Sequence, residues 1–138
     1  MMNVEWEKTC LAELDITATE LSSECLINVL CRIPSLRYLS AGQQDCFTDI
    51  VLKEFIENGN SKSLIALDLD RNENLSEDIL MKFLKNQASN LRGLQLSGIP
   101  HLTEQFWTVI IPALKNIRLV QIIFTLTIRS NFIVIFFN

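Results

Sequence analysis

The chain of 138 residues has the length of one domain, and 49% of its residues are apolar, which predicts a packed core and excludes general disorder. Its net charge of −4 comes from scattered carboxylates without a stripe of Lys and Arg, so nucleic acid is not an expected partner. Residues 1–10 form an N-terminal segment that carries Glu5 and Glu7 and lacks the apolar run of a secretory signal.

A six-residue pattern then recurs, with aliphatic residues at its first and fourth positions and an apolar residue at its sixth. Its five copies begin at Leu11, Leu36, Leu64, Leu91 and Leu114, so successive copies are 25, 28, 27 and 23 residues apart. This spacing lies in the range of leucine-rich repeats, which stack into solenoids. We therefore predict an α/β leucine-rich repeat solenoid over residues 11–119, with four full repeats and a fifth strand.

The alternation within each copy predicts a half-buried strand whose aliphatic residues enter the core. The strands should be parallel, follow one another in sequence order and line a concave face, centred on Leu14, Leu39, Leu67, Leu94 and Ile117. A helix should follow each of the first four strands on the convex side. The predicted helix starts combine a hydroxyl cap with acidic residues and begin at Ser22, Thr48, Ser76 and Thr103.

The residues that could support chemistry lack the necessary spacing. Cys10, Cys25, Cys31 and Cys46 form no C-x-x-C pair and His101 is the single histidine, so we expect no zinc site and mostly buried thiols. Reduced thiols indicate a cytoplasmic location, with the nucleus as a second setting.

Alternate polar residues from Asp68 to Asn74 begin like a calcium loop, but Glu73 and Ile79 replace the glycine and glutamate that such a loop requires. No catalytic motif is present. We therefore expect no metal, no cofactor and no enzymatic activity.

The variable strand positions are candidates for binding another protein, because they stand on the predicted concave face. One row across the strands should contain Asp15, Ser40, Asp68, Gln95 and Arg118, acidic at one end and basic at the other. Arg and Tyr are enriched at interface hot spots. The candidate binding residues are Glu13, Asp15, Arg37, Tyr38, Asp68, Arg92, Gln95 and Arg118. The alternative is that these residues are merely solvated.

Two stretches resemble the cysteine-containing leucine-rich repeats of F-box proteins. They are Leu67-Asp68-Leu69 with Asn74-Leu75-Ser76-Glu77, and Ile99-Pro100-His101-Leu102-Thr103-Glu104. The sequence departs from that subtype after the strands, where a cysteine or asparagine is expected. Asp70, Arg71 and Asn72 occupy this place in the third repeat and Ser97 and Gly98 in the fourth, so we expect an irregular ladder of turn residues.

The resemblance implies repeats that select a substrate for a cullin-type ubiquitin ligase. In that family a separate F-box binds the ligase adaptor, and residues 1–9 are too few to contain one. We therefore expect adaptor binding only in a longer form, with this chain being a fragment, a short isoform or another kind of adaptor. The alternative is a scaffold or regulatory repeat protein, such as a phosphatase or nuclease regulator, without a link to ubiquitin ligation.

Residues 120–138 form an apolar tail that shows no repeat pattern. Three interpretations remain open: a membrane anchor, a pair of strands that closes the solenoid edge, or sequence foreign to the domain. Arg129-Ser130-Asn131 interrupts the apolar stretch, which makes a membrane an unexpected partner and predicts a turn between two strands.

Overall fold

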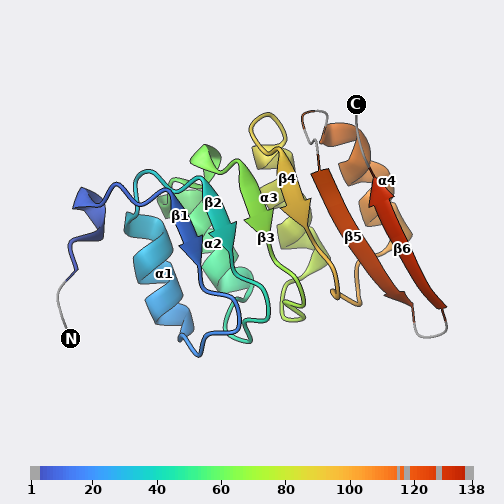
Figure 1. Ribbon diagram of the computed structural model, residues 1–138, viewed down its shortest axis with the longest axis horizontal. Coiled ribbons are helices and arrows are strands. Elements are labelled where there is room, and N and C mark those ends of the chain that lie inside the picture. The colour runs from blue at the N-terminus through green and yellow to red at the C-terminus, as the bar shows by residue number, and fades with distance from the viewer. Residues whose placement is uncertain (1–3, 115, 117–118, 127–128, 136–138) are drawn as a thin grey trace.

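The computed structural model describes residues 4–114, 116, 119–126 and 129–135, and it contains one six-stranded sheet whose strands follow the order of the sequence. Strands β1 to β5 run parallel, and β6 pairs with β5 in the antiparallel direction. The strands are β1 (Glu13–Asp15), β2 (Tyr38–Ser40), β3 (Ala66–Asp68), β4 (Gly93–Gln95), β5 (Leu119–Leu126) and β6 (Arg129–Ile135). Figure 1 shows them side by side.

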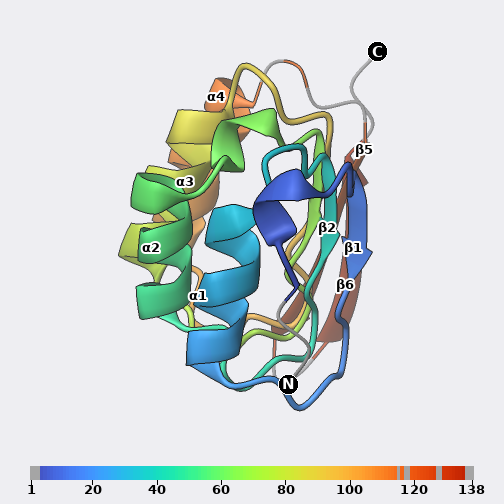
Figure 2. The same ribbon diagram turned by 90° about the vertical axis from the view of Figure 1, so that its left-hand side faces the viewer.

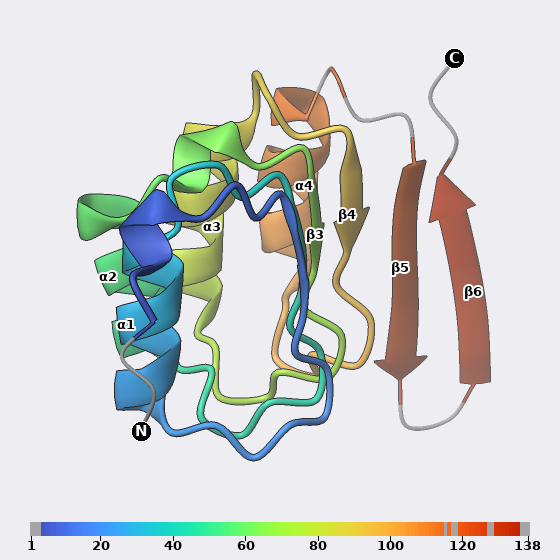
Figure 3. The same ribbon diagram turned by 60° about the vertical axis from the view of Figure 1, so that its left-hand side comes forward.

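The helices cover one face of this sheet and leave the other open (Figure 2). They are α1 (Ser23–Arg32), α2 (Asp49–Asn58), α3 (Glu77–Gln87) and α4 (Glu104–Ala113), with short 3₁₀ turns η1 (Trp6–Lys8) and η2 (Ser61–Ser63). Each helix packs against the next, and η1 packs against α1 beside an ion pair between Arg32 and Glu7. The chain is therefore a row of strand–helix units (Figure 3).

The helices begin where the hydroxyl caps predict. The side chains of Ser22, Ser76 and Thr103 accept hydrogen bonds from the amides of Cys25, Ile79 and Phe106 at 3.2, 3.5 and 3.3 Å. These bonds satisfy amides that have no partner within the first helical turn. Thr48 stands at the predicted position before α2, but its side chain makes no capping bond.

The core lies between the sheet and the helices. Leu39, Leu67 and Leu94 are buried at the centres of their strands, as the alternation predicts. Leu14 is only partly buried because β1 is the first strand of the sheet. The helices supply the opposite wall, with the buried side chains Leu26, Leu30, Val51, Leu52, Phe55, Leu80, Phe83, Leu84, Phe106, Trp107 and Ile110.

Polar side chains join the first three units at the turns that follow the strands. The amide nitrogen Nε2 of Gln44 donates to Thr19 Oγ1 at 2.9 Å, and the backbone amide of Gln44 donates to Asn72 Oδ1 at 2.9 Å. Asn72 Nδ2 donates to the carbonyl of Ala41 at 2.8 Å. Ile99 takes the equivalent place in the fourth unit. The ladder is therefore irregular in residue type, as expected, yet it is continuous over three units.

The fifth strand differs in register from the prediction. Leu94 lies opposite Val120, not Ile117, which itself is outside the described residues. At the end of α4 the Leu114 amide donates to the carbonyls of Ile110 and Ile111, and β5 begins at Leu119. The pairing of Leu94 with Val120 places the fifth strand three residues later in the chain than the sequence pattern predicts.

The tail contains a pair of strands, the second of the three interpretations. Leu126 pairs with Arg129, so the two strands are separated by residues 127–128, and the predicted turn at Arg129-Ser130-Asn131 is wrong because these residues belong to β6. Within the described residues, no helix has the length and apolar character needed to cross a membrane.

Candidate functional site

The candidate site is the sheet face opposite the helices, which we call the open sheet face. It comprises the solvent-facing residues at positions 12, 13, 15, 37, 38, 40, 65, 66, 68, 92, 93 and 95. The strand register arranges these residues in three rows across β1 to β4. The rows bring together residues that are 25 to 28 positions apart in the sequence.

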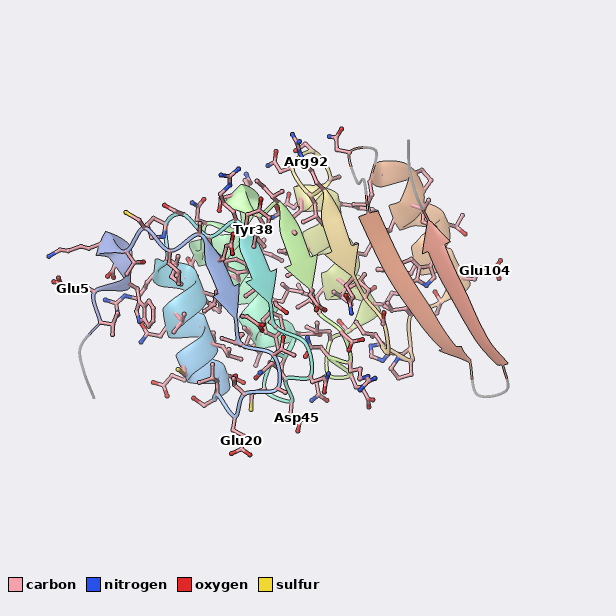
Figure 4. All side chains as sticks on the ribbon, in the orientation of Figure 1. Glu5, Glu20, Tyr38, Asp45, Arg92 and Glu104 are labelled. Atoms are coloured by element: carbon pink, nitrogen blue, oxygen red, sulfur yellow. The ribbon has the colours of Figure 1, made fainter. Side chains whose placement is uncertain are left out.

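The first row lies at the amino-terminal edge of the strands and contains Ala12, Arg37, Ile65 and Arg92. Backbone bonds of 2.7 to 2.8 Å connect it, from the Arg37 amide to Ala12, from Ile65 to Arg37 and from Arg92 to Ile65. Both arginines are exposed, and within the described part of the chain neither has a recorded ion pair. Figure 4 shows Arg92 at this edge. The first row therefore presents two cations, Arg37 and Arg92, to a partner.

The third row, Asp15, Ser40, Asp68 and Gln95, lies at the carboxyl-terminal end of the strands and is acidic. The Thr17 amide donates to Asp15 Oδ1 at 2.9 Å, and this bond holds the pKa of Asp15 below its usual value. The Asp70 amide donates to Asp68 Oδ1 at 2.8 Å. Among the described residues neither Asp15 nor Asp68 has a recorded ion pair. Both carboxylates are thus oriented by backbone amides and open to an external cation.

The middle row, Glu13, Tyr38, Ala66 and Gly93, decreases in side-chain size from β2 to β4. Tyr38 is 41% exposed, while Ala66 and Gly93 leave space beside it. A surface hollow of about 510 Å³ lies over the middle and third rows of all four strands. The open sheet face therefore combines two exposed cations, two oriented carboxylates, an aromatic side chain and a concavity.

The structure places seven of the eight candidate residues on this face: Glu13, Asp15, Arg37, Tyr38, Asp68, Arg92 and Gln95. Arg118 is outside the described residues. Because of the register shift, Gln121 is the β5 residue opposite Gln95, so the basic end predicted for the third row is wrong. Ala66 and Gly93 are not among the predicted binding residues, although the sequence shows small residues at the third position of both copies of the pattern.

The groups with metal or catalytic potential are dispersed. His101 hydrogen-bonds the Leu75 carbonyl in a turn, and Asp68 and Asp70 hold backbone or neighbouring side-chain partners. In the segments that the structure describes, no group of three or more His, Cys, Asp or Glu could hold a metal ion.

The chain matches no protein-family model and no curated protein. Among solved structures, it is similar to one described as the tropomodulin C-terminal domain of Caenorhabditis elegans. The similarity has a TM-score of 0.68 at 19% sequence identity and covers 88% of this chain and 79% of that chain. This chain has a leucine-rich-repeat-like fold. At this identity the similarity shows the fold and repeat character alone, with the parallel sheet common to both.

Proposed function

We propose that the protein is a non-enzymatic interaction module, a leucine-rich repeat solenoid that binds another protein through the open sheet face. The observation that carries the proposal is the pair Arg37 and Arg92, exposed in one row without recorded ion pairs within the described chain, beside the exposed Tyr38. Exposed arginine and tyrosine residues supply much of the binding energy at protein interfaces. Stacked repeats present such residues on a continuous, concave surface.

The specific form of this proposal is substrate recognition for a cullin-type ubiquitin ligase. Its support is the resemblance of the third and fourth units to the F-box repeats, in which a serine or threonine cap and an acidic residue open the helix. Ser76 with Glu77 and Thr103 with Glu104 are such pairs, and both caps make the expected bonds. An F-box supplied by a longer form would recruit the adaptor, in the cytoplasm or the nucleus.

The alternative is a scaffold or regulatory protein unrelated to ubiquitin ligation. The departure from the cysteine-containing subtype favours it, because Thr19 and Gln44 occupy the turn ladder in the first two units and Ile99 ends it, so that Asn72 alone has the residue type expected there. Both forms of the proposal use the same binding surface.

The test of the surface is a double charge reversal, Arg37→Glu with Arg92→Glu, in the full chain. The matched control is Lys53→Glu with Lys85→Glu, which makes the same change in charge at exposed positions of α2 and α3. Proteins captured by the wild-type chain are quantified against both variants after circular dichroism shows that each is folded. We expect capture to be lost with the arginine variant and retained with the lysine variant, because exposed substitutions affect stability little.

Equal capture of these proteins by the wild-type chain and by the arginine variant would contradict binding through the open sheet face.

The ligase form of the proposal has its own test, in which the chain is expressed with any F-box encoded upstream. Recovery of adaptor and cullin by the extended form alone is expected. Recovery of neither by an F-box-containing form would contradict the ligase proposal and leave the scaffold alternative.

A further inference from the structure

We infer that the hollow over Ala66 and Gly93, which we call the central hollow, receives an apolar side chain of a partner protein, and that Asp15 and Asp68 pair with a lysine or arginine of the same partner segment. This inference rests on the proposed function, because it names the chemistry of the segment that the open sheet face binds. Its basis is the geometry of the middle and third rows.

The glycine at position 93 is not required by the backbone. Gly98 is the glycine with a positive φ angle among the described residues, whereas Gly93 lies in an ordinary strand that any residue can adopt. A Cβ atom added at Gly93 would lie 3.2 Å from the Cβ of Ala66, a tight contact, and 3.9 Å from its Cα. Glycine weakens a strand interior and often marks the close approach of a ligand. Glycine at this position therefore avoids crowding against Ala66, and the two small residues leave space above them that a side chain of a partner can enter.

The surroundings of the central hollow are apolar where the occupant would sit. Ala66 lies directly between Tyr38 and Gly93 in the register, so the exposed tyrosine ring stands at the side of the space that the two small residues leave. The hollow also reaches the backbone of the strand centres at Leu67 and Leu94. An aliphatic or aromatic side chain seated here would gain contact with an aromatic wall, as anchor residues of interfaces do.

The charge of the neighbouring row defines the residue next to that anchor. Asp15 and Asp68 lie two residues farther along their strands than Glu13 and Ala66, about 6.8 Å at the rise of a strand. This distance matches the reach of a side chain adjacent to the anchor. Both carboxylates are held in place by backbone amides, so they are positioned before a cation arrives.

The first row excludes the reversed orientation of the partner segment. Arg37 and Arg92 lie on the amino-terminal side of the central hollow and would repel a basic residue placed there. A partner segment with an apolar anchor and a basic residue toward Asp15 and Asp68 therefore satisfies both rows. An acidic residue on the other side of the anchor would add a favourable pair with the arginines.

The experiment uses a display library of random twelve-residue peptides selected on the immobilised full chain. The variants Gly93→Leu and Ala66→Leu fill the central hollow. Thr108→Leu is the control, since it adds apolar bulk at an exposed position of α4, on the helical side of the sheet. We expect selection to enrich peptides in which an apolar residue is followed closely by Lys or Arg. Their affinity should fall at least about tenfold with either filling variant and stay near wild type with Thr108→Leu.

The charge pairing has a separate readout. In Asp15→Asn with Asp68→Asn, the same peptides should bind about tenfold more weakly, and the wild-type affinity should decrease with added salt more steeply than that of the variant. Enriched peptides without the apolar and basic pair, or with affinities unaffected by Gly93→Leu and Ala66→Leu, would overturn the inference. If the enriched peptides still failed to bind the variant Arg37→Glu with Arg92→Glu, the proposed function would stand without this inference.

A second copy of the chain is the competing occupant. Sedimentation velocity over a range of concentrations distinguishes it, because a dimer that dissociates in Gly93→Leu would mean that the central hollow binds another copy and would overturn the assignment to a partner protein. We expect wild type and variant to sediment identically.

Discussion

Single strand positions set both the stability and the chemistry of this protein. In β3 the side chain of Leu67 is 3% exposed within the core, while its neighbours Ala66 and Asp68 face the open side of the sheet. The difference follows from the pleat, which directs successive side chains to opposite faces. Substitution at Leu67 should therefore change the free energy of unfolding, and substitution at its neighbours should change binding.

Leu67→Ala is expected to lower the free energy of unfolding by about 2–5 kcal/mol, because it removes buried methyl groups and leaves a cavity. Urea unfolding followed by circular dichroism measures this change. The control is Ile65→Ala in the same segment, which is partly exposed and should cost less than Leu67→Ala. A change below about 0.5 kcal/mol for Leu67→Ala would be inconsistent with its place in the core.

The cysteines should differ in reactivity. Cys10 is exposed, whereas burial, with a smaller contribution from the charge of Glu54, raises the pKa of the Cys31 thiol. Because the thiolate is the reactive form, iodoacetamide at pH 8 should modify Cys10 well before Cys31. Mass spectrometry of peptides from the folded protein measures both rates. Equal rates in the folded chain, compared with urea-unfolded protein as the control, would contradict the burial of Cys31.

At the scale of elements, the turn ladder joins units that the sheet and helices also connect. Asn72 is 1% exposed and bonds to both the Gln44 amide and the Ala41 carbonyl of the preceding unit. A buried amide or carbonyl without a partner is costly, so this side chain stabilises the junction between the second and third units.

Asn72→Ala should reduce the free energy of unfolding by about 2–4 kcal/mol, since it leaves two buried backbone groups without their partners. The control is Asn74→Ala, two residues away, which also removes a 2.8 Å bond to the preceding unit but at an exposed site. Thermal unfolding compares the two variants. Similar small losses for both would mean that the ladder does not contribute to the stability of the junction.

The sequence predicts the first four strands and helices because two independent signals agree there, namely the alternation within each pattern and the caps behind it. At the fifth copy these signals conflict. Leu114, Ile117 and Leu119 fit the pattern, but so do Ile117, Val120 and Ile122, and the pairing of Leu94 with Val120 agrees with the second set. Periodicity alone does not decide between two overlapping patterns, and this produced the error in the register of the fifth strand.

The candidate site was predictable in part for a similar reason. Alternation places Tyr38 and Asp68 on one face without any structure. Ala66 and Gly93 both occupy the third position of their copies of the pattern, so their pairing could also be read from the sequence. The hollow above them could not, because it depends on the side chains that surround it in space.

At the scale of the whole molecule, each unit contacts mainly its neighbours. The recorded contacts of β5 are with β4 and β6, and the helices pack in the order α1, α2, α3 and α4. In such an arrangement, disturbance at one end should affect the adjoining unit and leave distant units folded.

Deletion of residues 120–138 should therefore leave the first three units folded. The fourth unit should lose protection, because β4 would become the edge of the sheet. Hydrogen exchange measures this, with strong protection expected in α1 to α3 and faster exchange in α4. Solubility should rise because an apolar, β-prone segment is removed. Cooperative loss of all helical circular dichroism would show that the two final strands are required for the entire fold.

The central claim, that the open sheet face binds another protein, is tested most directly by site-specific photo-crosslinking. A photoreactive phenylalanine is placed at Tyr38, 41% exposed on the open face, or at Ile50, 65% exposed on α2. We expect a discrete adduct with another protein after irradiation of the Tyr38 variant in cells, and none with the Ile50 variant. Adducts from position 50 but not from position 38 would contradict it and assign binding to the helical side.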